Sequence, residues 1–303
     1  MDRRIKLRHI QAFVEIIRAR SLKKAAERLF LTQPAMSRTL AELEDIAGAP
    51  LMTRGRAGVA LTPQGELFHR HAQASLAQIE RGLAALAQPD PGARRLALGV
   101  LPSVATRVMP GVAAELAQMA PELHLTIADG PHDQMTAQLR AGQLDAVIGR
   151  MGAPDTMRGL AFAQLYMEQV AIVVRPGHPL LTDPDLHALG RWPVIWPPPW
   201  AAIRPLVERF FILNGVPEPA HRIETVSGAF GRVQVPQTDA VWFISEGVVA
   251  LELADGRLAR VPLSTAGTEG PVGLMTRADE APSAERRLLG LALDRTLARL
   301  GLA

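Results

Sequence analysis

The chain has 303 residues, enough for two domains or more, and its 48% apolar and 21% charged residues are ordinary for a globular protein. It has no cysteine, which excludes disulfides and thiolate metal sites, and no apolar run approaches the roughly 18 residues that cross a membrane. The formal net charge of +3 is uneven, because residues 1–88 hold 14 Lys and Arg against 8 Asp and Glu while the remainder is slightly acidic. This asymmetry favours a polyanion-binding module joined to a neutral body.

The first 30 residues carry the pattern of two short helices. Apolar side chains recur three and four residues apart at Ile10, Phe13, Val14 and Ile17, which predicts an amphipathic helix. Ser21 is expected to cap a second helix over 22–29, because a serine oxygen can accept a hydrogen bond from the first turn.

A third helix is predicted to start after Thr32, with Pro34 tolerated in its first turn. Its expected buried residues are Met36, Leu40 and Leu43, and its expected polar face consists of Gln33, Ser37, Arg38 and Glu42. Glutamine pairs with adenine and arginine with guanine, so Gln33, Ser37 and Arg38 suit a recognition helix in the DNA major groove. The spacing alone leaves open an ordinary three-helix bundle with a solvated polar face.

The segment after this helix is expected to form a small hairpin with a Gly- and Arg-rich tip. Such a wing would place Arg54 or Arg56 on the DNA backbone or in the minor groove. A solvated surface hairpin is the plainer interpretation of the same residues.

Thr62 and Pro63 open a long predicted helix with a heptad-like seam formed by Phe68, Ala72, Leu76, Ile79, Leu83 and Leu86. The seam can pack on the rest of the chain, but a seam of this length directly after a DNA-binding module favours dimerisation. The helix should end at the Pro- and Gly-rich segment 88–92, the clearest domain boundary in the chain.

The N-terminal third resembles the LysR-type transcriptional regulators. The likeness rests on four segments with specific spacing: Ser21 to Leu29, Thr32 to Arg38, Leu43-Glu44, and Leu61 to Gly65. It implies that Thr32, Gln33, Pro34, Ser37 and Arg38 contact double-stranded DNA, with Arg54 and Arg56 on the wing.

The resemblance continues along the chain, where it is closest to regulators of protocatechuate degradation, the pca-operon type. The segments that carry it are 2–9, 101–110, 223–227 and 239–249, whereas 233–238 departs from the pattern. It implies an activator of aromatic-acid catabolism that works with RNA polymerase, assembles as a homodimer or homotetramer, and answers a small carboxylate of the carboxymuconate type.

Behind the boundary, strands and helices alternate. A strand through Leu96, Leu98 and Val100 is followed by predicted elements at 112–119, 123–128, 135–139 and 146–149, a βαβαβ run typical of a parallel sheet. A second unit is expected near Tyr166, with elements at 170–174, 194–196, 203–213 and 241–244. The chain then returns in a strand at 271–276 and a helix at 284–300.

This return resembles the two-lobed, periplasmic-binding-protein-like α/β fold of LysR effector domains. The expected organisation is a winged helix-turn-helix at 1–62, a linker helix and hinge at 63–92, and an effector-binding domain at 93–303. Lobe one is placed at 93–165 plus 268–303, and lobe two at 166–267.

Ligands of such sheets bind beyond the carboxyl ends of the strands, here between the lobes. Ser103 and Thr106 follow the first strand at a helix start, and Arg150 ends the third strand, so these residues suit a carboxylate. The remaining candidate effector-binding residues are His132, Trp196, Trp200 and Arg204. Plainer roles exist for several of them: Ser103 can cap its helix, Arg150 can bridge the lobes, and His132 and Trp200 can be surface or packing residues.

A LysR-type regulator of another small-molecule pathway is the first alternative to this function, and an enzyme and a solute-binding protein are two further ones. An enzyme would need a catalytic motif, but the sequence has no Gly-rich phosphate loop, zinc-spaced His pair or Gly-x-Ser-x-Gly nucleophile, so no metal or cofactor is expected. A solute-binding protein conflicts with the basic N-terminal module and with a start that lacks a signal peptide. The same start predicts a cytoplasmic protein that does not act on membranes.

Overall fold

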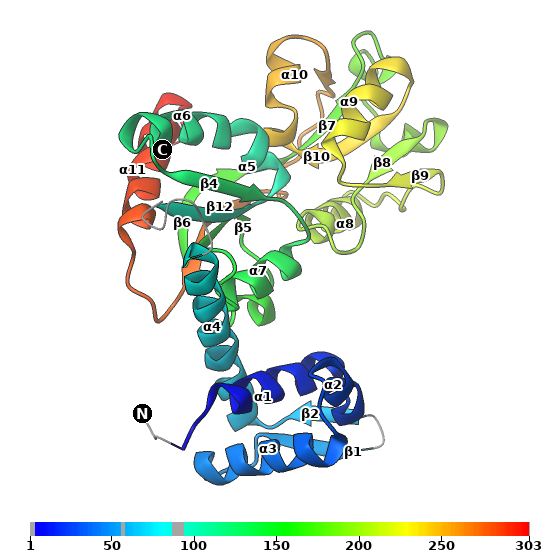
Figure 1. Cartoon of the computed structure of the whole chain (residues 1–303). Coiled ribbons are helices and arrows are strands. Elements are labelled where there is room, and N and C mark those ends of the chain that lie inside the picture. Colours follow the sequence, from blue (N-terminus) through cyan, green and yellow to red (C-terminus); the bar gives the residue numbers. More distant parts are fainter. Residues whose placement is uncertain (1–3, 56–57, 87–93, 303) are drawn as a thin grey trace. The chain divides into compact units, whose positions relative to one another are not determined.

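The computed structural model describes residues 4–55, 58–86 and 94–302 (Figure 1). The chain divides into two compact units, Met1–Gly92 with Arg140–Gln143, and Ala93–Leu139 with Leu144–Ala303. Within the described ranges, no helix is long and apolar enough to cross a bilayer.

The N-terminal unit consists of helices and one two-stranded antiparallel sheet. Its elements are α1 (Leu7–Ala19), α2 (Leu22–Arg28), α3 (Gln33–Ala47), β1 (Met52–Gly55), β2 (Gly58–Leu61) and α4 (Pro63–Leu86). The predicted caps are present, because the Ser21 hydroxyl accepts from the Lys24 amide and the Thr32 hydroxyl from the Ala35 amide, each at 3.4 Å. Local sequence therefore sets where α2 and α3 begin.

The core of this unit is built from the predicted apolar faces. Phe13, Met36, Leu40 and Leu43 are at most 1% exposed. The start of α4 joins them, since Ala72 is buried in this core and the Phe68 ring lies 5.4 Å from that of Phe13. The first residues of the predicted seam therefore belong to the core of the N-terminal unit.

The later seam residues lie differently. Ile79 and Leu83 are 42% and 62% exposed, while the side chain of Leu86 lies outside the described part. The first half of the seam thus packs on its own domain, as the alternative interpretation allowed, and only the second half is available to a partner.

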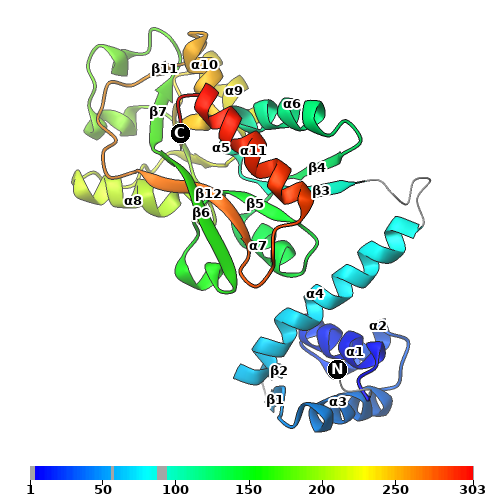
Figure 2. The same ribbon diagram turned by 90° about the vertical axis from the view of Figure 1, so that its left-hand side faces the viewer.

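The second unit holds two mixed five-stranded sheets, one in each lobe (Figure 2). The first sheet has the order β4-β3-β5-β12-β6, with β3 parallel to β4 and β5, and β12 antiparallel to β5 and β6. Its strands are β3 (Arg95–Val100), β4 (His124–Ala128), β5 (Ala146–Arg150), β6 (Leu160–Glu168) and β12 (Gly270–Arg277). Its helices are α5 (Pro102–Arg107), α6 (Met109–Met119), α7 (His132–Arg140), η1 (Pro154–Met157) and α11 (Ala284–Arg299).

The second sheet has the order β11-β7-β10-β8-β9, in which β8 is parallel to β10 and β9. Its strands are β7 (Val170–Val174), β8 (Val194–Trp196), β9 (Arg222–Glu224), β10 (Val241–Ser245) and β11 (Ala259–Arg260). Its helices are η2 (Pro179–Leu181), η3 (Leu186–Arg191), α8 (Arg204–Leu213), α9 (Gly228–Gln237), η4 (Glu246–Val248) and α10 (Ala250–Ala254).

The chain crosses between the two sheets twice, after β6 and before β12. The crossings lie together, because the Val170 amide donates to the Thr268 hydroxyl at 3.1 Å. The first crossing comes later than expected: β6 continues to Glu168, and Tyr166 is buried in the core of the first lobe. β6 is an edge strand whose residues alternate in exposure, so its sequence lacks the continuous apolar run of a buried strand.

Phe30 occupies a position that normally favours glycine. Its φ is +55°, and its amide and that of Leu31 donate to Glu27 and Ala26 carbonyls, the hydrogen bonds of a Schellman turn. Its side chain is 96% exposed, so the ring gains little from folding.

We expect Phe30→Gly to raise the free energy of unfolding of the N-terminal unit by about 1 kcal/mol, because glycine has no Cβ to clash in this conformation. Phe30→Ala, which keeps the Cβ, is the control and should gain little. Urea unfolding of both variants measures the effect. Equal or lower stability in the glycine variant would contradict this account of the turn.

Candidate functional site

The predicted recognition surface is the start of α3. Thr32, Gln33, Pro34 and Arg38 are exposed there, Ser37 is half-buried, and the first turn has amides without helical partners. The opposite face of the same helix is buried in the core. The arrangement places hydrogen-bonding side chains and the positive helix end on one surface, as DNA recognition requires.

Two glutamates hold α3 in place from behind. Glu42 contacts the buried His9 side chain at 3.2 Å and Arg8 at 3.3 Å, so it is tied to α1 instead of lying free on the polar face. The hydrogen bond to His9 lowers the pKa of Glu42. Glu44 accepts from the amides of Leu51 and Met52 at 2.7 and 3.3 Å, which fixes the start of the wing relative to the helix.

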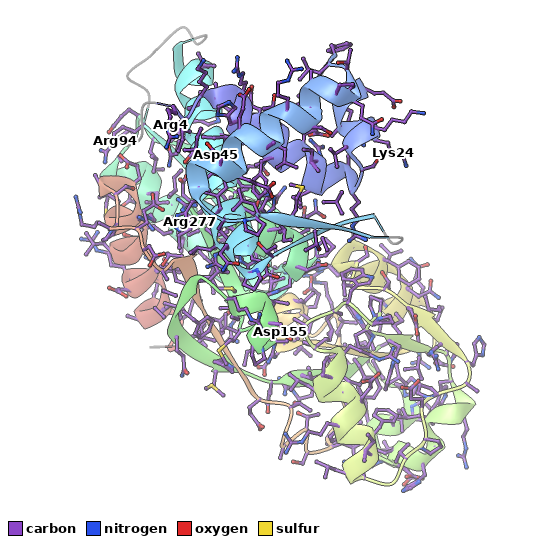
Figure 3. The ribbon with its side chains drawn as sticks, turned by 90° about the horizontal axis from the view of Figure 1, so that it is seen from below. Arg4, Lys24, Asp45, Arg94, Asp155 and Arg277 are labelled. Carbon is purple, nitrogen blue, oxygen red and sulfur yellow. The ribbon has the colours of Figure 1, made fainter. Side chains whose placement is uncertain are left out.

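The wing is the antiparallel pair β1 and β2, in which Arg54 pairs with Val59. Arg56 and the side chain of Arg54 lie outside the described residues, so their DNA contacts remain predictions. Figure 3 shows Lys24, an exposed cation, projecting outward from α2. Gly65 is required where α4 begins, because a Cβ there would lie 1.7 Å from the Leu51 carbonyl oxygen.

The second unit contains a cavity of about 690 Å³ lined by both of its lobes. Five predicted effector residues meet in its wall: Ser103, Thr106, His132, Arg150 and Trp200. The volume is in the range of small-molecule sites. The described residues contain no group of three or more His, Asp and Glu side chains placed to hold a metal ion.

Arg150 is the most unusual group in this wall. It is only 4% exposed, yet neither of its terminal nitrogens, Nη1 and Nη2, has a hydrogen-bond partner among the described residues. Its Nε donates to the Ser245 hydroxyl at 3.4 Å, and Nη2 lies 3.5 Å from Glu168 Oε2 in an ion pair. Burial lowers the pKa of Arg150 although Glu168 opposes the shift. An anion entering the cavity would supply the missing acceptors.

The lobes also touch through backbone groups beside Arg150. Glu168 Oε1 accepts from the Gly247 amide at 3.1 Å, and the Thr106 hydroxyl donates to the Gly247 carbonyl at 2.8 Å. Thr106 therefore lines the cavity while its hydroxyl bridges the lobes. Ser103 is buried in the first turn of α5, where the Val104 and Ala105 amides already donate to the Leu101 carbonyl.

His132 and Trp200 line the cavity in different ways. His132 is the first residue of α7, is 8% exposed and lies against Gly152, where a Cβ would come within 2.2 Å of the imidazole. Trp200 is 52% exposed, so its ring can cover a bound molecule without leaving a core position.

The other two predicted effector residues do not line the cavity. Trp196 is fully buried in the core of the second lobe, packed edge-to-face on Phe211 and Phe243. Arg204 donates to Glu208, Glu218, Glu224 and the Pro197 carbonyl. Its donors are therefore already engaged, which leaves it unable to bridge a ligand to Arg150 as the sequence suggested.

Several polar groups of the second lobe line the cavity although they were not among the predicted effector residues: Thr225, Ser227, Arg232 and Ser245. Ser227 offered a signal, since a serine before Gly-Ala-Phe can cap a helix, and its hydroxyl accepts from the Phe230 amide at 3.2 Å. That cap starts α9, the helix that carries Arg232.

Comparison with known proteins identifies both units. Residues 7–66 match the family model described as bacterial regulatory helix-turn-helix protein, lysR family, and residues 89–296 match the LysR substrate binding domain. The HTH-type transcriptional regulator PcaQ of Agrobacterium fabrum is 44% identical over 293 residues, covering 95% of this chain and 94% of the relative. The uncharacterized regulator YdcI of Escherichia coli is 35% identical over 299 residues, covering 98% and 97%.

Solved structures share the fold. The full-length regulator LysG of Corynebacterium glutamicum with a bound arginine effector superposes with a TM-score of 0.62 at 17% identity, covering 97% of this chain and 99% of that one. At this identity the likeness concerns the fold alone.

Arg204→Ala should lower the free energy of unfolding by about 1–3 kcal/mol, because it leaves three carboxylates without their shared cation. Arg222→Ala is the matched control: it pairs with the same Glu218 and Glu224 but is one-third exposed, so its loss should be below about 1 kcal/mol. Denaturant unfolding of the two variants measures both values. Equal losses would contradict the structural role assigned to Arg204.

Proposed function

Because the chain belongs to the LysR family of transcriptional regulators, we propose that it activates an operon for the catabolism of an aromatic acid, protocatechuate. LysR regulators bind DNA and small-molecule effectors and are not enzymes, and this chain has one unit for each ligand. On this proposal the effector is a small carboxylate of the carboxymuconate type. The 44% identity with PcaQ, a pca-operon regulator, over nearly the whole chain supports the pathway.

The buried guanidinium of Arg150 is the observation that carries the effector class. A carboxylate can accept from both Nη1 and Nη2 in a bidentate pair and neutralise the buried charge, whereas a neutral oxygen acceptor supplies no compensating charge. Ser103, buried in the cavity wall at the start of α5, adds a hydroxyl.

The proposal also names the regulator's macromolecular partners. Promoter DNA would be read by α3 and held by the wing, and the exposed second half of α4 would join copies of the chain into a homodimer or homotetramer. As an activator it would contact RNA polymerase. It would act in the cytoplasm, where the bacterial chromosome lies.

Arg38→Ala is expected to remove specific promoter binding, since one lost bidentate base contact costs about 1–3 kcal/mol. Arg18→Ala, which removes an equally exposed arginine from α1, controls for the change in net charge and should keep sequence preference. Gel shifts with the chain's own promoter and a scrambled fragment compare them. If Arg38→Ala keeps the affinity and selectivity of the parent, α3 does not recognise the promoter sequence through Arg38.

The double substitution Ile79→Asp and Leu83→Asp should break the dimer, because it places charges on the exposed half of α4 where two copies would meet. Both side chains are exposed in the single chain, so folding should be unaffected. The control is Gln78→Asp with Glu80→Gln, which leaves the apolar residues intact. Light scattering that shows unchanged assembly in the Ile79/Leu83 variant would overturn this interface.

Titration calorimetry with protocatechuate-pathway acids tests the effector class. The parent chain should bind a carboxymuconate, and Arg150→Ala should bind it at least roughly tenfold more weakly while keeping its affinity for promoter DNA. Absence of binding by the parent would sink the effector class, and equal binding by Arg150→Ala would sink the site.

A further inference from the structure

The cavity has a second guanidinium, on the wall opposite Arg150. Arg232 lies on α9 in the second lobe and lines the same cavity as Arg150 of the first lobe. Its side chain is 28% exposed, so a ligand in the cavity can reach it.

The orientation of Arg232 is fixed from behind. Its Nε donates to Glu252 Oε1 at 2.8 Å, and its Nη2 donates to the Val248 carbonyl. Its Nη1 faces Gly228, where a Cβ would lie 2.8 Å from that nitrogen. Since Gly228 itself lines the cavity, Nη1 of the Arg232 guanidinium lies at the cavity wall.

Arg232 also lies beside the positive end of its own helix. Nη1 is next to the first residue of α9, where the amides of the first turn have no helical acceptor. Glu252 already pairs with Nε of Arg232, but the helix end adds about half a positive charge beside Nη1, which favours a carboxylate at that nitrogen. Together with the unsatisfied Nη1 and Nη2 of Arg150, this gives the cavity two separate positions that favour negative charge.

Two carboxylates in the wall do not cancel these positions. Glu224 is engaged by Arg204 and Arg222 at 3.3 and 3.0 Å. Asp129 is exposed, so solvent screens its charge.

We propose that Arg232 is the second carboxylate anchor of the effector cavity, and that the site therefore selects ligands with carboxylates at two ends over monocarboxylates. One carboxylate pairs with Arg150 and the other with Nη1 of Arg232 and the first turn of α9. Arg232 takes the place that the sequence analysis gave to Arg204. This inference rests on the proposed function.

Calorimetry with the full chain tests it, using carboxymuconate, muconate and protocatechuate as ligands with three, two and one carboxylates. The parent should prefer the first two. Arg232→Gln should weaken their binding roughly 10- to 100-fold, the loss expected for a hydrogen bond to a charged group, and change protocatechuate binding little. Arg232→Lys, which keeps the charge and the contact with Glu252, should fall between.

Arg257→Gln is the matched control, because Arg257 contacts the same Glu252 oxygen at 3.4 Å but does not line the cavity. It should bind all three acids like the parent. If Arg232→Gln is poorly folded, the ratio of di- to monocarboxylate affinity in Arg232→Lys decides the question. A ratio equal to that of the parent in the folded Arg232 variants overturns this inference alone, whereas a parent chain that binds none of the acids overturns the proposed function as well.

Discussion

The second unit is organised around one buried guanidinium, that of Arg150, which contacts residues of both lobes. Arg150 ends β5 and contacts Ser245 and Glu168, residues that lie where β10 ends and where the chain crosses from one sheet to the other. Burying such a pair stabilises a fold only when every hydrogen-bonding position is filled. Here Arg150 Nη1 and Nη2 and Glu168 Oε2 are not filled by the described residues. On the proposed function, a bound carboxylate would fill the two positions on Arg150.

The same pair explains how a ligand could be sensed at a distance. Gly247 receives contacts from Glu168 and Thr106, and it must be a glycine because a Cβ would come within 2.5 Å of Glu168 Oε1. A carboxylate on Arg150 competes with Glu168 for the same cation. The contacts that join the lobes here, Arg150 to Ser245 and Glu168 to Gly247, would then depend on occupancy, and a ligand that prefers one lobe arrangement would shift the population toward it.

The DNA-binding unit could be predicted from sequence because its signals are local. Ser21, Thr32 and the three- and four-residue spacing of Met36, Leu40 and Leu43 act within one or two turns of a helix. The structure contains the corresponding caps and buried face. The division of α4 was not predictable in this way. Its seam is continuous in sequence, and only the packing of Phe68 on Phe13 shows where the chain's own core ends.

The sequence predicted the cavity residues of the first lobe, but it did not predict most of those that the second lobe contributes. Residues at strand ends, such as Ser103 and Arg150, follow from the rule that ligands bind at the carboxyl ends of parallel strands. Trp196 was expected in the cavity wall but lies in the core. Because β8 is buried on both faces, its sequence has no alternation that shows which way each side chain points. Sequence alone does not distinguish Arg204 from Arg232. Arg204 is surrounded by Glu208 on its own helix and by Glu218 and Glu224 from later segments, whereas Arg232 contacts Glu252 and the Val248 carbonyl.

If the Arg150–Glu168 pair serves ligand binding, its two charges are retained at the expense of stability. Thermal melting of the double variant Arg150→Met, Glu168→Gln tests it, because the two changes remove both charges while the glutamine can still accept from Gly247. Replacing a buried ion pair in this way is often neutral or stabilising by about 1–4 kcal/mol. We predict that the double variant melts no lower than the parent without ligand and loses the rise in melting temperature that carboxymuconate gives the parent. A clearly lower melting temperature without ligand, or a preserved rise with it, would contradict the account.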